Sequence, residues 1–362
     1  MKLKRGKDFS QKIRRELIDQ YMAEEVFEQK FKNLNKQVEA DSIKTKAKRK
    51  KNLPRLAVLM FIIVLFLLTI PISYFTFNHN SIETIASAEI VGDYSSSYPL
   101  TAYSNIPKFS KKFVLDDELS AEKAYIFIPE MGKKVFQQKS GRKSSVASLT
   151  KLMVAYTIFT QGDMGEEVCV SSDAQLYGSI DLEKEDCFKK DDLTQHLLTH
   201  SSNDAAVQFK NYFSTNELDL IDEMNKNAKK LNLQNTEFSN SVGLDDINNY
   251  STAEDVGSLL HAVSINEDLN SMMSVKTDTL SALNNENTYE YETTNQLLLE
   301  REEIIIGKTG FTSEAGGCLA IKLKKEDWDY SVIFVILGSD DTETRFSDMN
   351  YLIDTFLETY GL

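Results

Sequence analysis

The sequence contains few of the residues on which metal-dependent and histidine-dependent enzymes rely. Its 362 residues include 4 histidines and 3 cysteines. The nucleophile-elbow pattern G-x-S-x-G is absent, which argues against a hydrolase with a Ser-His-Asp triad. His196 and His200 are four apart on a predicted helix and could share a zinc ion, but the H-E-x-x-H arrangement and an evident third ligand are missing. We therefore expect neither a metal nor a cofactor, and we interpret both histidines as ordinary residues of a helix face.

Charge is absent from one long run near the N-terminus. The 20 residues from Leu56 to Phe75 carry no charged side chain and are dominated by Leu, Ile, Val and Phe. Such a run is long enough to cross a bilayer core of about 30 Å. We therefore predict one transmembrane helix over residues 56–77.

Basic residues are distributed unequally around this run. Residues 1–55 hold 17 Lys and Arg against 8 Asp and Glu, a net charge of +9, which leaves −23 for residues 56–362. No basic residue follows the run until Lys108. Cytoplasmic flanks of membrane spans carry an excess of Lys and Arg. The sequence therefore predicts a single-pass protein of the cell membrane, with a cytoplasmic N-terminus and an extracytoplasmic remainder.

A cleaved signal peptide is the alternative to this anchor. Ala86-Ser87-Ala88 has the small-x-small form of a cleavage site. This tripeptide lies well beyond the apolar run, and the segment before the run is far longer than a usual charged n-region. We therefore favour an uncleaved signal anchor.

The segments that flank the apolar run differ in composition. Residues 1–55 predict an amphipathic cytoplasmic helix that binds a partner or lies on the inner membrane face, with a solvated helix of no such role as the alternative. Nucleic-acid binding is disfavoured, because the basic stretch adjoins the membrane and lacks interleaved aromatic residues. Residues 78–118, which include Pro99, predict a stalk before one large domain at 119–362. The apolar positions of the first segment are Phe9, Ile13, Leu17, Tyr21, Phe27, Phe31, Leu34 and Val38.

Three short motifs follow one another in the large domain. They are Ser148-Leu149-Thr150-Lys151, Ser201-Ser202-Asn203 and Lys308-Thr309-Gly310. The Ser-x-x-Lys pattern alone is weak evidence, because 120–123 and 140–143 also fit it. The local context has to decide which of Ser120, Ser140 and Ser148 belongs to a functional site.

Of the three candidates, Ser148 alone opens an amphipathic helical pattern. Ser120 leads into a strand-like apolar run, and Ser140 lies beside a glycine in a charged loop. On a helix Ser148 and Lys151 are neighbours, and a lysine buried near other cations loses its proton more readily, so Lys151 could activate Ser148 as a nucleophile. The alternative is a helix-capping serine with a solvated lysine. The apolar positions of this helix are Leu149, Leu152, Met153, Tyr156 and Phe159.

The other two motifs lie on suitable local structure. Asn203 precedes a predicted helix start at Ala205, where a helix cap is the alternative interpretation. Lys308 follows the apolar run 304–306, so it lies at or near a strand, and Gly310 lets another group approach the backbone closely. Together the three motifs predict a nucleophilic serine site that uses a lysine base.

On these motifs the chain resembles the penicillin-binding serine D-alanyl-D-alanine carboxypeptidases, relatives of the serine β-lactamases. The resemblance runs from Ser120 to Leu357 and includes the stretches 121–156, 240–255 and 308–319. It implies an α/β (α+β) fold of the β-lactamase/DD-peptidase type, with an antiparallel sheet flanked by helices and an inserted helical subdomain. Strand-like runs at 124–137 and 303–337 fit this fold. Helical patterns lie between them at 148–160, 191–212, 217–231 and 252–263.

The resemblance also implies a role for each motif residue. Ser148 would attack the terminal D-Ala-D-Ala carbonyl of a peptidoglycan stem peptide, with Lys151 as general base, and β-lactams would acylate the same serine. Ser201 would relay the proton to the departing amine. Asn203 would orient Lys151 and hold a substrate amide.

The third motif would bind the substrate's carboxylate and its developing oxyanion. The resemblance implies that Lys308 attracts the carboxylate and that Thr309 and Thr312 hydrogen-bond it. The backbone N–H groups of Ser148 and Phe311 would form the oxyanion hole, a device that acyl transfer requires.

Several departures from the family pattern bear on the exact activity. Ser202 stands where these carboxypeptidases more often carry glycine, and 305–307 is less polar than usual. The sequence ends 54 residues after Lys308, where many relatives continue with a β-rich domain and a membrane helix, so we expect the anchor at the front.

Two alternative functions remain. A β-lactamase would need a glutamate that positions a deacylating water, and none can be assigned, because Glu237 falls in a segment that resembles the carboxypeptidases. A sensor that binds cell-wall peptide without turnover is the other alternative, although it would not need an activated serine.

The three cysteines all fall in the predicted extracytoplasmic part, where disulfides persist. Cys169 and Cys187 lie in short strand-like runs, and whether they pair is left open. We expect Cys318 to be a buried small apolar residue.

Overall fold

The structure is a computed structural model that describes residue 109 and residues 111–162, 166–171 and 182–362. These residues fall within one compact unit, 100–362. The predicted cytoplasmic segment, the predicted span at 56–77 and most of the predicted stalk lie outside the described residues. Within the described ranges, no helix is both long and apolar enough to cross a membrane.

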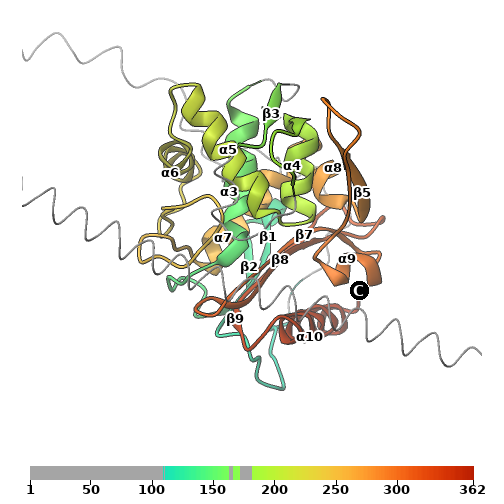
Figure 1. The fold of residues 1–362 in the computed structure, drawn as a ribbon. Helices are drawn as coiled ribbons and strands as arrows, with labels where there is room; N and C mark the ends of the chain where they lie inside the picture. The colour runs from blue at the N-terminus through green and yellow to red at the C-terminus, as the bar shows by residue number, and fades with distance from the viewer. Residues whose placement is uncertain (1–108, 110, 163–165, 172–181) are drawn as a thin grey trace, which may run out of the picture. The chain divides into compact units, whose positions relative to one another are not determined.

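Five antiparallel strands form the central sheet, in the order β2-β1-β9-β8-β7 (Figure 1). Two strands come from the start of the domain and three from its end, and β1 pairs with β9 to join them. This arrangement confirms the sheet that the strand-like runs at both ends of the domain predicted, and the antiparallel pairing that the family resemblance implied. The bounds are β1 Lys123–Ile128, β2 Lys133–Gln138, β7 Ile304–Thr312, β8 Gly316–Leu323 and β9 Val332–Ser339.

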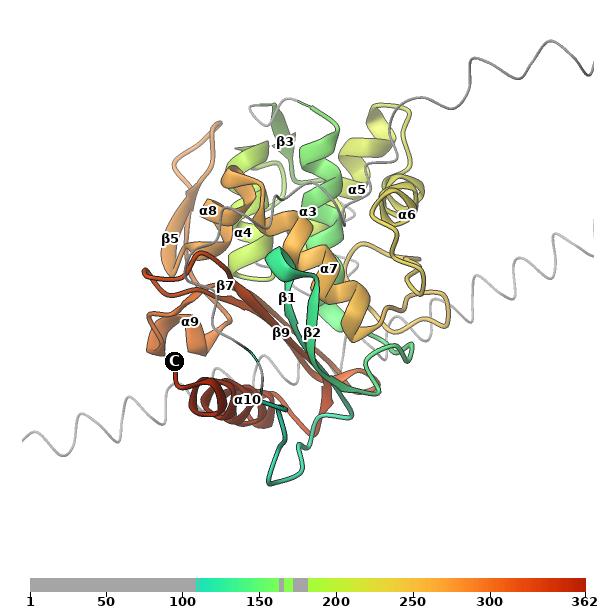
Figure 2. The ribbon, with the colours of Figure 1, turned by 180° about the vertical axis from the view of Figure 1, so that it is seen from behind.

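Helices cover both faces of the sheet, so its central strands are apolar on both sides. All eight residues of β9 except Gly338 are buried. Helix α10 (Thr344–Tyr360) packs on one face (Figure 2). There Phe356 meets Phe334 of β9 edge to face, with 5.5 Å between the ring centroids. Helix α7 (Ala253–Ser264) covers the other face. The sequence had not predicted α10.

The helical part lies between β2 and β7, as predicted. Its first helix is α3, which follows a short 3₁₀ turn, η4, and is buried on almost all sides instead of being amphipathic. The predicted helix over 191–212 is in fact two helices, because Ser201 has a left-handed backbone (φ 66°) that ends one and begins the other. The helix bounds are η4 Ala147–Leu149, α3 Thr150–Thr160, α4 Lys190–Thr199, α5 Asn203–Thr215, α6 Leu220–Lys230, α8 Glu267–Ser274 and α9 Gln296–Glu300.

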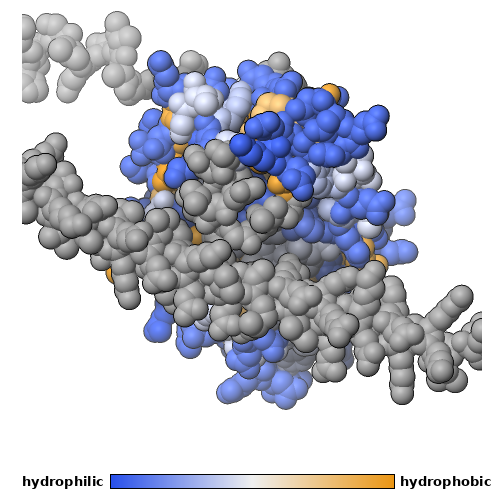
Figure 3. All heavy atoms as spheres, viewed as in Figure 1, coloured by the Kyte–Doolittle hydropathy of each residue, from blue (hydrophilic) through white to orange (hydrophobic). Residues whose placement is uncertain are grey.

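Two small hairpins complete the helical side. Strands β3 (Glu167–Cys169) and β4 (Cys187–Lys189) pair, and so do β5 (Thr277–Ser281) and β6 (Thr288–Glu292). The tip of the second hairpin docks beside the first, where Asn284 Oδ1 accepts a hydrogen bond from the Cys187 backbone N–H at 3.1 Å. The face in Figure 3 is mostly hydrophilic over this region, in keeping with a sequence that has more acidic than basic residues.

Candidate active site

The first and second motifs meet through the Lys151 side chain. Lys151 Nζ donates hydrogen bonds to Ser148 Oγ at 2.8 Å, to Asn203 Oδ1 at 2.8 Å and to the Val242 carbonyl oxygen at 2.9 Å. The lysine is fully buried, and the three acceptors fix its amine against the serine hydroxyl. This is the geometry of a serine with an adjacent base.

Local backbone structure presents Ser148 at this point. Ala147 has a left-handed backbone (φ 48°), and the short turn η4 then presents Ser148 two residues before α3 begins. Ser148 and Lys151 therefore lie at the start of the helix, three residues apart on one face, as the sequence predicted. A capping role for Ser148 finds no support, because no side-chain cap is present at either η4 or α3.

Ser202, rather than Asn203, caps the second motif's helix. The Ser202 side chain accepts the Ala205 backbone N–H at 3.0 Å. Asn203 is the first residue of α5, and its amide oxygen is thereby available to Lys151. The serine that departs from the family's usual glycine thus has a structural role at a helix N-terminus.

The segment after α6 forms another wall of the site. Asn240 Oδ1 accepts the backbone N–H groups of Gly243 and Leu244 at 2.8 and 3.0 Å, which closes a tight turn. This turn presents the Val242 carbonyl to Lys151 and brings Gly243 against the Ala147 carbonyl. The sequence showed that this segment resembled the family but did not show what it does.

Lys308 connects the third motif to the second. Its Nζ donates to Ser201 Oγ at 2.7 Å and to the Thr309 carbonyl at 3.1 Å. Burial lowers the pKa of Lys308 well below its usual value, and the positive charges of Lys151 and Arg345 lower it further. Two buried ammonium groups so close together disfavour each other, which favours a neutral amine in the site.

Arg345 of α10 is a site residue that the sequence did not predict. Its Nη1 donates to the Gly310 carbonyl at 3.0 Å, so helix α10 stabilises the strand beside Ser148. Gly310 itself has no room for a side chain, because a Cβ there would lie 2.9 Å from the Ser148 backbone nitrogen. No local pattern around Arg345 indicates this contact, which depends on the packing of α10.

The two threonines of the third motif have partners within the chain. Thr309 Oγ1 lies 2.6 Å from Thr294 Oγ1, just before α9. Thr312 Oγ1 donates to Asp245 Oδ1 at 2.7 Å and accepts the Ala315 backbone N–H at 3.0 Å. Phe311 lies between them, two residues beyond Thr309 on β7 and one beyond Gly310.

These motifs and this fold can be compared with known proteins. A model of the D-alanyl-D-alanine carboxypeptidase family matches residues 110–341. This chain belongs to that family. The match begins before β1 and ends after β9, so it spans the whole sheet and the helical part that carries the site.

Individual members of the carboxypeptidase family and solved structures agree with this assignment. The chain is 27% identical to D-alanyl-D-alanine carboxypeptidase DacF of Bacillus subtilis over 247 residues, which is 66% of this chain and 63% of that protein. The chain thus spans less than two thirds of that relative. Among solved structures, the Streptomyces K15 DD-transpeptidase has a TM-score of 0.62 and 22% identity, over 69% of this chain and all of the other, and it shows the same fold. Penicillin-binding protein D2 from Listeria monocytogenes, in an ampicillin-bound form, has a TM-score of 0.55 and 28% identity over 66% of this chain and 97% of that one.

The serines of the other two Ser-x-x-Lys sequences of this family member make structural hydrogen bonds to carboxylates. Ser120 Oγ donates to Asp348 Oδ2 at 2.8 Å, and Ser140 Oγ donates to Glu254 Oε1 at 2.8 Å. The spare Ser-x-Asn begins at Ser264, which donates to the His261 carbonyl at the end of α7. Of the three candidate serines, Ser148 is thus the one whose hydroxyl contacts the lysine of its own motif.

Two histidines and a cysteine of this carboxypeptidase-family chain lie near the motifs, since His200 directly precedes Ser201 and Cys318 pairs with Gly310 across β7 and β8. The His196 and His200 rings stack on each other at 5.0 Å, and the His196 ring packs edge to face on Tyr291. Cys318 is buried, and burial raises the pKa of its thiol to about 11, as suits a small apolar residue rather than a nucleophile.

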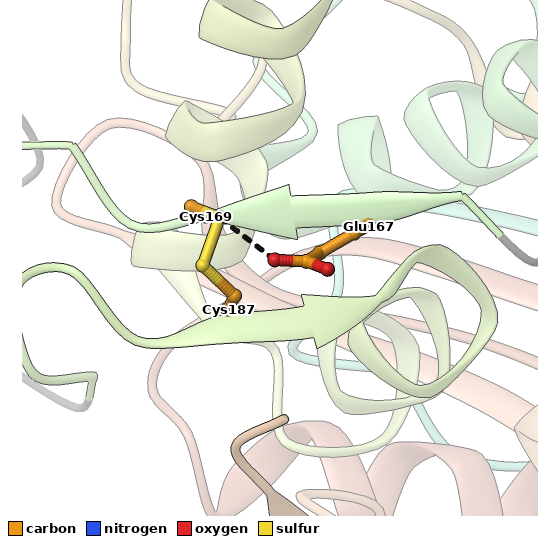
Figure 4. A group of neighbouring side chains, drawn as sticks. All are labelled: Glu167, Cys169 and Cys187. Carbon is orange, nitrogen blue, oxygen red and sulfur yellow. Dashed lines mark hydrogen bonds between the residues drawn. A yellow bond between two sulfur atoms is a disulfide. The ribbon is translucent and has the colours of Figure 1, made fainter. Parts of the chain in front are cut away.

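Cys169 and Cys187 form a disulfide across the β3–β4 pair (Figure 4). Within the described residues, Glu167 and these two cysteines are the one group close enough to hold a metal ion together. Glu167 Oε1 lies 3.4 Å from Cys169 Sγ. Sulfur in a disulfide is not a thiolate ligand, so the oxidised pair does not offer such a site.

Proposed function

We propose that this chain is a membrane-anchored serine D,D-carboxypeptidase that removes the terminal D-Ala from peptidoglycan stem peptides. The observation that carries the proposal is the Lys151 amine, which lies within hydrogen-bond reach of both Ser148 Oγ and Asn203 Oδ1. A serine needs an adjacent base to become a nucleophile, and this lysine is the group in contact with it.

Acylation begins with transfer of the Ser148 proton to a neutral Lys151. Ser148 Oγ then bonds to the carbonyl carbon of the penultimate D-Ala, and the carbonyl oxygen takes the negative charge. The backbone N–H groups of Ser148 and Phe311 donate to that oxyanion. Loss of one such donor typically costs about 2.7–4 kcal/mol of barrier.

Breakdown of the tetrahedral intermediate needs a proton on the leaving amine. Ser201 passes a proton to that nitrogen, and Lys308 Nζ, 2.7 Å from Ser201 Oγ, resupplies it. The carbon–nitrogen bond breaks, free D-Ala departs, and an ester on Ser148 remains. Water then attacks the ester carbonyl and gives a proton through Ser201 to Lys308, Lys151 returns its proton to Ser148 Oγ, and the shortened peptide departs as its carboxylic acid. A β-lactam would acylate the same serine through its ring carbonyl.

Recognition of the terminal carboxylate rests on positive charge beside β7. Lys308 and Arg345 supply the potential, and Thr309 donates a hydrogen bond. A cation in a buried site attracts an anion far more strongly than it would in water. This explains why the proposed site contains more cations than one proton transfer needs.

Membrane anchoring is the part of the proposal that rests on sequence alone. The uncharged run at 56–77 would be a single span with residues 1–55 in the cytoplasm, where they could contact a partner or the inner membrane surface. The catalytic domain would then face the peptidoglycan. Resistance of the full-length protein to alkaline carbonate extraction from cell membranes would test the anchor, and its release as a soluble protein would contradict it.

A β-lactamase is the competing enzyme, and it differs in how fast the acyl group leaves. The glutamate considered for deacylation, Glu237, accepts a hydrogen bond from Tyr250 OH at 2.9 Å and pairs with the same residue through its backbone. A side chain engaged in this way supports a structural role for Glu237. It therefore gives no reason to expect rapid release of a penicilloyl group.

The deciding experiment is a time course of fluorescent penicillin labelling on the full-length protein in membranes. We expect a long-lived adduct that Ser148→Ala abolishes and Ser140→Ala, the matched decoy variant, retains. Release of D-Ala from a D-Ala-D-Ala peptide should show the same dependence. An adduct that vanishes within seconds would instead indicate a β-lactamase. A folded protein with neither adduct nor D-Ala release would favour a sensor of cell-wall peptide.

A further inference from the structure

Asp245 lies at the edge of the proposed site in a position that the three motifs do not explain. Its Oδ1 accepts the hydroxyl proton of Thr312 at 2.7 Å. A threonine hydroxyl has one proton, so Thr312 cannot also donate to a substrate carboxylate while this bond persists. Thr312 and Asp245 together present acceptor atoms and a negative charge, which would repel a carboxylate.

The Asp245 carboxylate has spare binding capacity. It is half-buried, and its second oxygen makes no hydrogen bond or ion pair with another described residue. An ionised carboxylate has about four lone-pair positions, so one hydrogen bond leaves most of them open. A partly exposed carboxylate of this kind can receive an ammonium group from a ligand.

The backbone fixes Asp245 near the nucleophile. Gly243, two residues earlier, has a left-handed backbone (φ 90°), and a Cβ on it would lie 2.0 Å from the Ala147 carbonyl oxygen. The loop that carries Asp245 is therefore pressed against the segment that presents Ser148. On the opposite wall, the hydrogen bond from Thr312 holds Asp245 to the end of β7.

The order of residues along β7 gives the direction of a bound peptide. Gly310 is adjacent to Ser148, so the scissile carbonyl lies there. Under the proposed function, the terminal carboxylate binds on the Lys308 and Thr309 side of Gly310. The acyl portion of the peptide must then extend the other way, toward Thr312 and Asp245.

We propose that Asp245 is a specificity-determining residue that binds the free side-chain amine of a diamino acid next to the D-Ala-D-Ala unit. The inference rests on the proposed function and deepens it. The site would be bipolar, with cations at the carboxylate end and an anion at the acyl end, so that a peptide with both charges binds in one direction. A flexible aminoalkyl side chain can reach a half-buried carboxylate of this kind.

The test compares two peptides that differ by one charge, with the full-length protein in detergent. They are Nα-acetyl-L-lysyl-D-Ala-D-Ala and its Nα,Nε-diacetyl form. We expect wild-type kcat/KM to be about fivefold higher for the free amine, the usual upper effect of a partly exposed ion pair. Asp245→Asn keeps an acceptor for Thr312 and should abolish the preference by lowering only the value for the free amine.

Asp246→Asn is the matched control, because it removes the same charge from the neighbouring residue, whose Oδ1 accepts the Asn248 backbone N–H instead. It should preserve the preference. Equal rates for both peptides in the wild type would overturn the inference, as would a preference that survives Asp245→Asn or is lost equally in Asp246→Asn. A parallel loss for both peptides in Asp245→Asn would indicate that Asp245 only positions Thr312, and would overturn it too. If wild type hydrolyses neither peptide and Ser148 takes no penicillin, the proposed function fails and this inference with it.

Discussion

Gly243 lies so close to the segment that presents Ser148 that a Cβ on it would be 2.0 Å from the Ala147 carbonyl oxygen. It has a positive φ of 90°, a conformation that side chains other than glycine rarely adopt. The contact holds the Val242 carbonyl on Lys151 and sets the position of Ser148. Substitution at this glycine should therefore affect both the fold and the reaction.

We expect Gly243→Ala to lower the rate of penicillin acylation by more than tenfold and to destabilise the fold by about 3 kcal/mol or more, because backbone must move. Gly132→Ala is the control: it also has a positive φ, at 57°, but a Cβ there meets nothing within 4 Å. That variant should cost about 1 kcal/mol and leave acylation unchanged. Urea unfolding and labelling kinetics measure both effects, and similar results for the two variants would contradict the packing argument.

Lys308, which the proposed reaction uses, should reduce the stability of the protein at neutral pH. Because burial lowers its pKa, the unfolded chain binds a proton that the folded chain does not, between the folded pKa and the usual value of 10.5. The free energy of unfolding should rise with pH across that window, by up to about 1.4 kcal/mol per pH unit. Below the folded pKa the two states bind the same number of protons and the dependence ends.

The variant Lys308→Met removes this effect. We expect it to lose D-Ala release, to be at least as stable as wild type at pH 7, and to lose that advantage as the pH approaches 10. Lys210→Met, at an exposed position on α5, is the control, and its difference in stability from wild type should not change with pH. Urea unfolding at a series of pH values measures the free energy of unfolding of each protein. A constant difference between wild type and Lys308→Met across these pH values would contradict the prediction.

The disulfide between Cys169 and Cys187 should contribute to stability through the chain that it closes. For a sequence separation of 18, loop-closure entropy predicts about 3 kcal/mol. The double variant Cys169→Ser with Cys187→Ser should lose that amount in urea unfolding, and dithiothreitol should then have no further effect. Cys318→Ala keeps the bridge and should remain as sensitive to dithiothreitol as wild type. Insensitivity of the wild type would argue that the bridge is absent.

Thr294 should act on substrate binding through its hydroxyl contact with Thr309. If Thr309 donates its proton to the substrate's carboxylate, Thr294 donates to Thr309 across their 2.6 Å contact. Thr294→Val removes this donor at nearly constant volume, and we expect KM for a D-Ala-D-Ala peptide to rise about fivefold with little change in kcat. Thr293→Val is the control, since Thr293 accepts the Asn295 backbone N–H and does not contact Thr309. A fall in kcat alone would argue against this role.

Sequence patterns predicted the elements whose signals are local. The strand-like runs at both ends of the domain became the five-stranded sheet, and the helical patterns between them became the helical part. The helical pattern over 191–212 is divided between α4 and α5, and the helix start predicted near Ala205 is confirmed by α5, which begins at Asn203. The break itself was not predicted, because the left-handed Ser201, which allows the second motif to face Lys308, is not visible as a glycine or proline. Helix α10 was missed although Phe346, Met349, Leu352, Ile353 and Phe356 are all buried along one side.

The candidate residues of the site could be identified from the sequence. Ser148, Lys151, Asn203 and Lys308 could be selected because each belongs to a short pattern with a fixed spacing and order. The surroundings of those residues became visible in the folded chain: the Val242 carbonyl on Lys151, the lack of room at Gly243, Arg345 on the Gly310 carbonyl, and Asp245 on Thr312. The physical reason is that these contacts join residues far apart in the chain through backbone atoms and single side chains, and packing alone brings such groups within hydrogen-bond distance.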